Sequence, residues 1–131
     1  MVKNDHMAFR VSNMDQSIQF YTQTLGLRLL FRNINADVQE DYAILELEGG
    51  NLELIQRLDG LPFEPPELKP PYCPHLAFTS DDMDETLKMI REKHIPVVTG
   101  PLEIEGAEKW IYIHDPDNNV IEYIQWLRQT G

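Results

Sequence analysis

The stretch HMAFRVSNMDQSIQFY (residues 6–21) recurs 69 positions later as HLAFTSDDMDETLKMI (residues 75–90). The two segments share an initial His, an Ala-Phe pair and a Met-Asp pair at equal distances. A second match, GGNLELIQ (49–56) with NNVIEYIQ (118–125), has the same displacement. Agreement in one register at two separate places is the signature of a duplicated structural unit. The sequence therefore predicts two copies of one module.

Each copy has the pattern of a strand, a helix and then further strands. Alternating apolar residues predict strands in the first copy, and apolar residues at helical spacing predict a helix that begins near Asn13 or Asp15 and ends at Gly26. The predicted strands cover 6–11, 27–34, 41–48 and 51–58 in the first copy, with a hairpin at Gly49-Gly50. The second copy has a strand near 75–79, a helix over 82–93, and strands near 95–99, 110–115 and 119–126.

Residues 61–74 connect the two copies and hold six of the nine prolines of the chain. Proline fixes φ and removes a backbone donor, so neither a helix nor a central strand fits there. We expect a semi-rigid linker, with a loop folded over the site entrance as the alternative. The predicted organisation is one domain over 1–131, with module 1 at about 4–60 and module 2 at about 75–127.

Composition excludes several classes of function. The net charge of −11 argues against binding to nucleic acid or to an anionic membrane. Cys73 is the single cysteine, so a disulfide framework is not expected and a reducing compartment is the default. No export signal or long apolar run is visible, which predicts a cytoplasmic protein without a membrane span.

Four residues form two pairs with one spacing. His6 precedes Glu53 by 47 positions, and His75 precedes Glu122 by the same 47. Each His opens the first predicted strand of its copy, and each Glu lies inside an apolar last strand, where a carboxylate is costly unless it is paired or bound to metal. Two imidazoles and two carboxylates suit a divalent ion held where two modules face each other.

Either pair alone is better explained by a structural or exposed role, because such spacings arise by chance. The recurrence in register favours a metal site. His94, His114 and Cys73 have no counterpart in the other copy, and we interpret them as structural or surface residues.

Several motifs resemble one family. HMAFRV (6–11), Ser17-x-x-Phe20-Tyr21 and Leu25-Gly26-Leu27 are similar to the N-terminal signature of glyoxalase I, and DPDNNVIEYI (115–124) resembles its DPDG-x-x-IEL ending. The chain thus resembles the vicinal oxygen chelate superfamily, and within it glyoxalase I (lactoylglutathione lyase). That resemblance implies the glyoxalase/bleomycin resistance/dioxygenase fold, which is α+β with duplicated βαβββ modules forming a cupped mixed sheet. It also implies a homodimer whose site can be shared between chains.

The resemblance assigns roles to individual residues. His6, Glu53, His75 and Glu122 match all four metal positions, for nickel or zinc first and iron, cobalt or manganese as alternatives. Glu122 corresponds to the catalytic base, and Glu53 to a ligand that can take part in proton return. The implied reaction converts a methylglyoxal–thiol hemithioacetal into an α-hydroxy thioester through a metal-bound enediolate.

Two arginines indicate which kind of thiol forms the hemithioacetal substrate. Arg10 matches the arginine that holds the glutamyl carboxylate of glutathione. Arg57 stands where glyoxalase I has a glutathione-contacting asparagine, so the thiol is expected to be anionic without necessarily being glutathione.

Three alternatives remain open. An enzyme similar to methylmalonyl-CoA epimerase would use the same scaffold, although such relatives usually carry Gln at the Glu53 position. A dioxygenase would need iron and oxygen. A small-molecule-binding protein of this superfamily would work without turnover.

Overall fold

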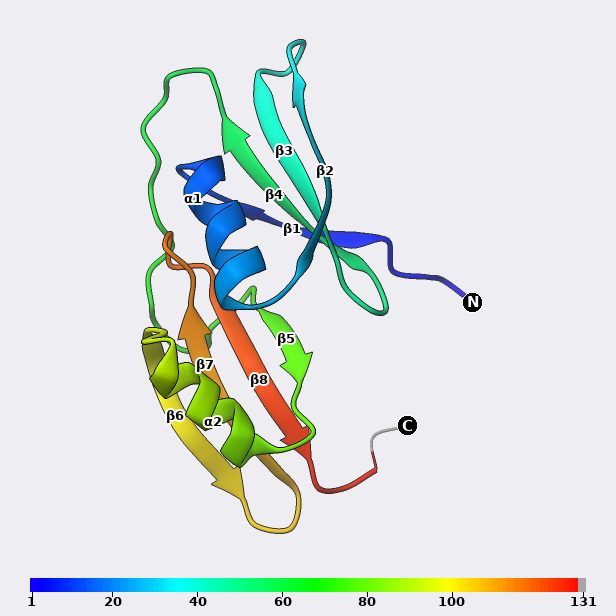
Figure 1. Ribbon diagram of the computed structural model, residues 1–131, viewed down its shortest axis with the longest axis vertical. Helices are drawn as coiled ribbons and strands as arrows, with labels where there is room; N and C mark the ends of the chain where they lie inside the picture. Colours follow the sequence, from blue (N-terminus) through cyan, green and yellow to red (C-terminus); the bar gives the residue numbers. More distant parts are fainter. Residues whose placement is uncertain (130–131) are drawn as a thin grey trace. The chain divides into compact units, whose positions relative to one another are not determined.

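The computed structural model describes residues 1–129 and divides at Pro65–Pro66 into two compact units, which we call module 1 and module 2. Module 1 contains β1 (His6–Arg10), α1 (Met14–Gln19), the π-helical turn η1 (Phe20–Thr24), β2 (Arg28–Asn35), β3 (Glu40–Glu46) and β4 (Asn51–Arg57) (Figure 1). Module 2 contains β5 (Leu76–Thr79), α2 (Met83–Glu92), β6 (Val97–Ile104), β7 (Glu108–His114) and β8 (Val120–Trp126).

Each module forms a mixed four-stranded sheet in which the first strand lies beside the last. The strand orders are β1-β4-β3-β2 and β5-β8-β7-β6. The first and last strands are parallel, and the remaining neighbours are antiparallel. Ala8 lies opposite Glu53 in module 1, and Ala77 lies opposite Glu122 in module 2. The predicted α+β fold with duplicated βαβββ modules is confirmed.

A glutamine side chain joins the last strand to the start of the helix in both modules. The Met14 backbone N–H donates to Gln56 Oε1 at 2.8 Å, and the Met83 N–H donates to Gln125 Oε1 at 2.9 Å. The first N–H groups of a helix have no partner within the helix, so the glutamine satisfies one of them. The repeat of Gln56 as Gln125 is thus a repeat of a structural contact.

Capping residues fix where both helices begin. The Asn13 side chain accepts a hydrogen bond from the Gln16 N–H, and the Asp82 side chain accepts from the Asp84 and Glu85 N–H groups. Both caps have extended backbone angles, which is the usual conformation of an N-cap residue. The helix start predicted near Asn13 is confirmed.

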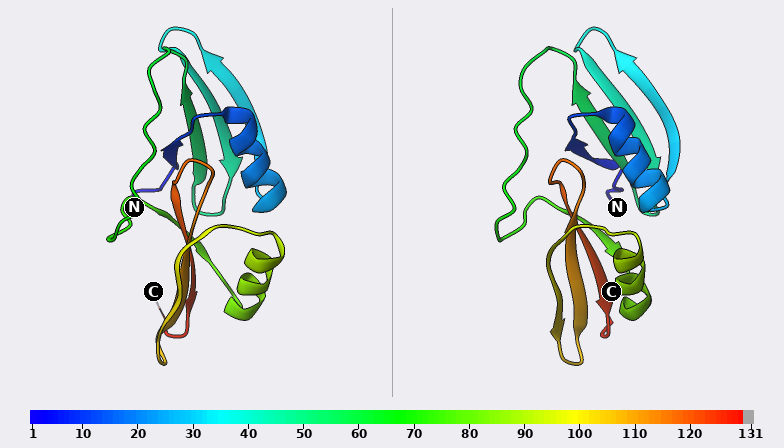
Figure 2. Two further views of the ribbon diagram at one scale, coloured as in Figure 1. Left: turned by 90° about the vertical axis from the view of Figure 1, so that its left-hand side faces the viewer. Right: turned by 60° about the vertical axis from the view of Figure 1, so that its left-hand side comes forward.

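The helix of each module covers one face of its sheet (Figure 2). In module 1 the strands turn Phe9, Leu52 and Leu54 toward α1, and these side chains are buried. Strand side chains alternate between faces, so His6 and Glu53 lie on the other face. We call this side of each sheet, which its own helix does not cover, the open face.

Module 2 repeats this division between two faces. Ile111, Ile113 and Ile121 are buried on the face toward α2. Tyr112 and Glu122 alternate with them along β7 and β8, and therefore belong to the open face.

Strand β6 is longer than the sequence pattern predicted. The sequence predicted a strand near 95–99. The structure continues the strand to Ile104, with irregular pairing on both sides of Thr99. Since β6 is the edge strand of its sheet, a proline without an N–H costs no ladder hydrogen bond on the outer side.

The turn between β7 and β8 is organised by a buried carboxylate. Asp115 Oδ1 accepts from the backbone N–H groups of Asp117 and Asn119 at 2.8 Å each, and its Oδ2 accepts from Asn119 Nδ2 at 2.9 Å. Asp115 is only 1% exposed. Asn118 has a φ of +65°, which asparagine tolerates better than most residues. The turn fixes the start of the strand that carries Glu122.

Replacing Asp115 with Ala should destabilise the fold, because it leaves buried N–H groups without an acceptor. We expect a loss of about 2–3 kcal/mol in the free energy of unfolding, measured by urea denaturation. Asp37→Ala, at an exposed position in the β2–β3 turn, is the control and should change stability by less than about 0.5 kcal/mol. Equal stability of the two variants would contradict the role of Asp115.

Candidate functional site

In module 1, His6 and Glu53 meet on the open face. His6 Nε2 lies 3.5 Å from Glu53 Oε1. The parallel pairing of β1 with β4 places Ala8 opposite Glu53, so His6, two residues earlier on the same face, is the diagonal neighbour of Glu53. The other ring nitrogen, Nδ1, lies 2.6 Å from Asp5 Oδ2. The hydrogen bond with Asp5 raises the pKa of His6, and the nearby charge of Glu53 acts in the same direction.

In module 2, His75 and Glu122 form the corresponding pair. His75 Nε2 lies 3.0 Å from Glu122 Oε1, and its Nδ1 lies 2.6 Å from the carbonyl oxygen of Tyr72. This pair is more enclosed, with side-chain exposures of 24% and 11% against 43% and 19% for His6 and Glu53. The two pairs have the same construction but different surroundings.

The chemistry of the His75 contacts fits a bound cation. A neutral imidazole has one N–H, and a carbonyl oxygen and an ionised carboxylate both only accept. If Nδ1 donates to Tyr72, the short approach of Nε2 to Glu122 requires a positive charge between them, either a proton or a metal ion. An acceptor on Nδ1 is also the usual arrangement behind a histidine that binds metal through Nε2.

Each module holds one His and one Glu whose side chains are of the kind that binds metal ions. Within residues 1–129, no group of three or more His, Cys, Asp or Glu side chains is gathered closely enough to hold a metal ion. The structure brings His6 to Glu53 within module 1 and His75 to Glu122 within module 2.

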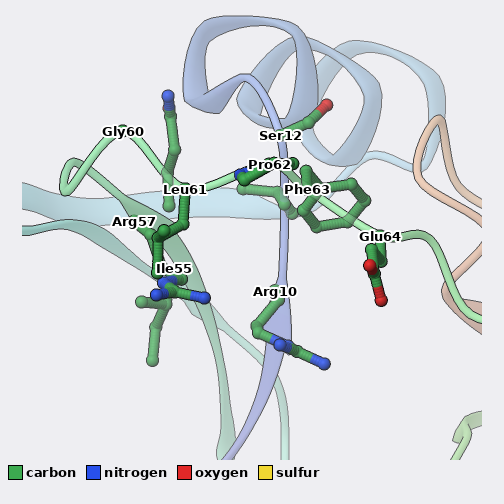
Figure 3. A pocket seen from close by; sticks show the side chains of 11 residues that line it. Arg10, Ser12, Ile55, Arg57, Gly60, Leu61, Pro62, Phe63 and Glu64 are labelled. Atoms are coloured by element: carbon green, nitrogen blue, oxygen red, sulfur yellow. The ribbon is translucent and has the colours of Figure 1, made fainter.

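A pocket of about 270 Å³ lies in module 1 between the ends of β1 and β4 and the chain that follows β4 (Figure 3). Arg10 and Arg57, the two arginines that the sequence singled out, both line it. Leu61, Phe63 and Glu64 line it as well. The first residues of the proline-rich connection are thus part of a pocket wall, as well as of a linker.

Asp59 fixes Arg57 in this pocket and was missed by the sequence analysis. Arg57 Nε and Nη2 donate to Asp59 Oδ2 at 3.1 and 2.5 Å, and the Leu61 N–H donates to Asp59 Oδ1 at 3.1 Å. The hydrogen bonds from Arg57 and Leu61 lower the pKa of Asp59. The Arg-x-Asp spacing that begins at the last residue of β4 is the signal that could have indicated this contact.

Tyr112 is a second residue that the sequence analysis missed. It lies directly opposite Glu122 in the β7–β8 ladder, and its ring meets the His75 ring edge to face with centroids 5.4 Å apart. Burial raises the pKa of Tyr112, and the charge of Glu122 adds to this effect. The equivalent position opposite Glu53 is Ile44, so the repeat gave no signal for a tyrosine here.

The other two histidines and the cysteine were predicted from the sequence to be structural or surface residues. His94 follows the end of α2, is exposed and has a φ of +53°. His114 Nδ1 contacts the Asp115 carbonyl oxygen at 2.8 Å, and Cys73 is an exposed free thiol. Across residues 1–129, no helix is both long enough and apolar enough to cross a membrane.

Comparison with known proteins places the chain in a family. Residues 3–123 match the model of the glyoxalase/bleomycin resistance protein/dioxygenase superfamily. A probable lactoylglutathione lyase of Vibrio cholerae is 32% identical over 125 residues, which span 92% of this chain and 88% of the relative.

Two solved structures share the fold. The trypanothione-dependent glyoxalase I of Leishmania major has a TM-score of 0.73 and 22% identity, covering 95% of this chain and 87% of that one. The antibiotic-binding protein TnmS3 from a Streptomyces species has a TM-score of 0.70 and 21% identity, with coverage of 96% and 97%. The duplicated modules, the paired His and Glu residues and the family match agree, and the chain belongs to the glyoxalase/bleomycin resistance protein/dioxygenase superfamily.

Proposed function

We propose that the protein is a glyoxalase I-like lyase that isomerises the hemithioacetal of a 2-oxoaldehyde, such as methylglyoxal, into an α-hydroxy thioester. The observation that carries this proposal is the pair of His–Glu contacts at equivalent positions on the open faces of both modules. The similarity to a probable lactoylglutathione lyase along nearly the whole chain supports it.

His6, Glu53, His75 and Glu122 would hold one divalent metal ion, with nickel or zinc as the first candidates. The bound metal ion would polarise the two neighbouring oxygens of the substrate and so make the carbon-bound proton easier to remove. The donor set of two imidazoles and two carboxylates suits such an ion and balances its charge. The hydrogen-bond acceptors at Nδ1 of both histidines, Asp5 and the Tyr72 carbonyl, would hold each ring with Nε2 toward its glutamate.

Glu122 would act as the base that takes the proton from one carbon and returns it to the next. Its side chain is 11% exposed, against 19% for Glu53, so fewer water molecules reach it to compete for the proton. Glu53 would serve as a ligand and assist proton return.

Arg10 and Arg57 would hold the carboxylates of the thiol in the module 1 pocket. Guanidinium groups bind carboxylates with charge-assisted hydrogen bonds, which are stronger than neutral ones. The solved Leishmania major enzyme is described as trypanothione-dependent, so the thiol differs among proteins of this fold. For this chain we propose an anionic thiol, with glutathione as one member of the class.

We further propose a cytoplasmic homodimer, in which the two half-sites that complete one metal site come from one chain or from two. The single cysteine of the sequence, Cys73, supports a reducing compartment, because it leaves no disulfide within one chain.

Removal of one ligand should abolish metal binding. His75→Ala should lower the affinity for Ni²⁺ or Zn²⁺ by more than roughly 100-fold, because a lost ligand costs more than a lost supporting contact. The measurement is chelator competition together with elemental analysis. His94→Asn is the matched control, since asparagine tolerates the positive φ at that position, and it should keep full occupancy. Unchanged binding by His75→Ala would refute the ligand set.

Glu122→Gln should remove the base while keeping the size of the side chain. We expect kcat for the methylglyoxal–thiol adduct to fall roughly 10²–10⁴-fold, with metal content measured on the same samples. Glu46→Gln, on an exposed glutamate of β3, should retain activity. A Glu122→Gln protein that turns over at the wild-type rate would eliminate the assigned base.

Arg57→Asn should change which thiol is accepted. We expect KM for the adduct of mercaptosuccinate, a small thiol with two carboxylates, to rise about 10-fold because one charge-assisted hydrogen bond is lost, while KM for the glutathione adduct changes less. Arg28→Asn, at the exposed start of β2, controls for lost surface charge. Equal changes for both thiols would show that Arg57 does not select between them.

A further inference from the structure

Two tyrosines hold the His75 ring from different directions. The carbonyl oxygen of Tyr72 lies 2.6 Å from His75 Nδ1, and the Tyr112 ring meets the imidazole nearly perpendicularly, at 89°. The rings of Tyr72 and Tyr112 also pack on each other, with centroids 4.8 Å apart. The loop before β5 and the strand β7 are therefore joined around this histidine.

Module 1 has a different arrangement at the equivalent places. Ile44 lies opposite Glu53, where module 2 has Tyr112 opposite Glu122. The His6 ring has an exposed carboxylate, Asp5, at Nδ1 in place of a backbone carbonyl. The module repeat does not account for the two tyrosines, which suggests a role particular to module 2.

We propose that Tyr72 and Tyr112 form an aromatic clamp that positions His75 so that its Nε2 faces Glu122. This inference rests on the proposed function, in which His75 is a metal ligand. A flip of the imidazole about its Cβ–Cγ bond would exchange Nδ1 for a carbon and break the contact with Tyr72. The Tyr112 ring limits the space in which the imidazole can turn. Tyr112 is thus a positioning residue that acts through His75.

The clamp depends on ring packing, so removing the ring and removing the hydroxyl should have different effects. Tyr112→Leu should weaken Ni²⁺ or Zn²⁺ binding about 10-fold or more, as is typical when a contact that orients a ligand is lost. Tyr112→Phe removes only the hydroxyl and keeps the ring, so it should bind the metal ion at near the wild-type level. Tyr42→Leu, which removes a tyrosine from β3 that packs edge to face on Phe31 in module 1, is the control and should bind metal normally.

A second measurement needs no metal. Nitrogen-15 NMR of the histidine side chains in the metal-free protein, recorded at a pH at which the His75 ring is neutral, should show its one proton on Nδ1, where it faces the Tyr72 carbonyl. In Tyr112→Leu the same measurement should give a mixture of tautomers. If the wild-type protein binds no metal, the proposed function fails, and the tautomer measurement still judges the clamp.

Metal affinity and the His75 tautomer should also be measured in Tyr72→Leu, a variant at a position outside the strands. This variant tests the clamp if Tyr112→Leu does not fold. This substitution keeps the Tyr72 carbonyl and removes only the ring that packs on Tyr112. Its expected effect is therefore a loss of metal affinity and a mixture of His75 tautomers in the same direction as in Tyr112→Leu, but smaller. Folded leucine variants with unchanged metal affinity and unchanged His75 signals would overturn the proposal.

Discussion

The parallel pairing of the first strand with the last strand of each module is the constraint on which the site depends. It sets β1 beside β4 and β5 beside β8, so that a His and a Glu 47 positions apart become diagonal neighbours on one face of the sheet. The glutamine contact to the helix start and the capped helix fix the crossover between these strands. A slip of one residue in this register would send each glutamate to the buried face.

The two modules share a backbone fold and differ in the side chains that surround their glutamates. Around Glu53 the surroundings are more exposed and mixed, with Ile44 opposite it, Asp5 at the histidine and two arginines further along the sheet. Around Glu122 they are aromatic and enclosed. Duplication thus provides two similar half-sites, and substitution around them gives each half different surroundings. In the proposed function, the enclosed half would carry out proton transfer, and the two arginines of module 1 would anchor a charged thiol.

The repeat made much of the fold predictable from the sequence. Equal spacing and the matched segments at both ends of the interval indicated the two modules, and Asn13 was one of two residues predicted to cap the first helix. What lay outside the repeat was harder. Tyr112 and Asp59 contribute through contacts that form only after folding, and neither residue has a counterpart of the same type in the other copy. The length of β6 was missed because the tolerance of an edge strand for proline depends on sheet order, which the local pattern does not contain.

Because both open faces belong to one chain, they are always produced in equal numbers. A sheet with a helix on only one side leaves side chains such as Ile44 and Ile55 in module 1, or Tyr112 and Ile124 in module 2, without cover from their own helix. If the two modules were separate polypeptides, the ratio between them would depend on two expression levels. Because one chain encodes both, every molecule synthesised adds one of each. The stoichiometry of the half-sites is therefore fixed at translation and does not vary with protein concentration.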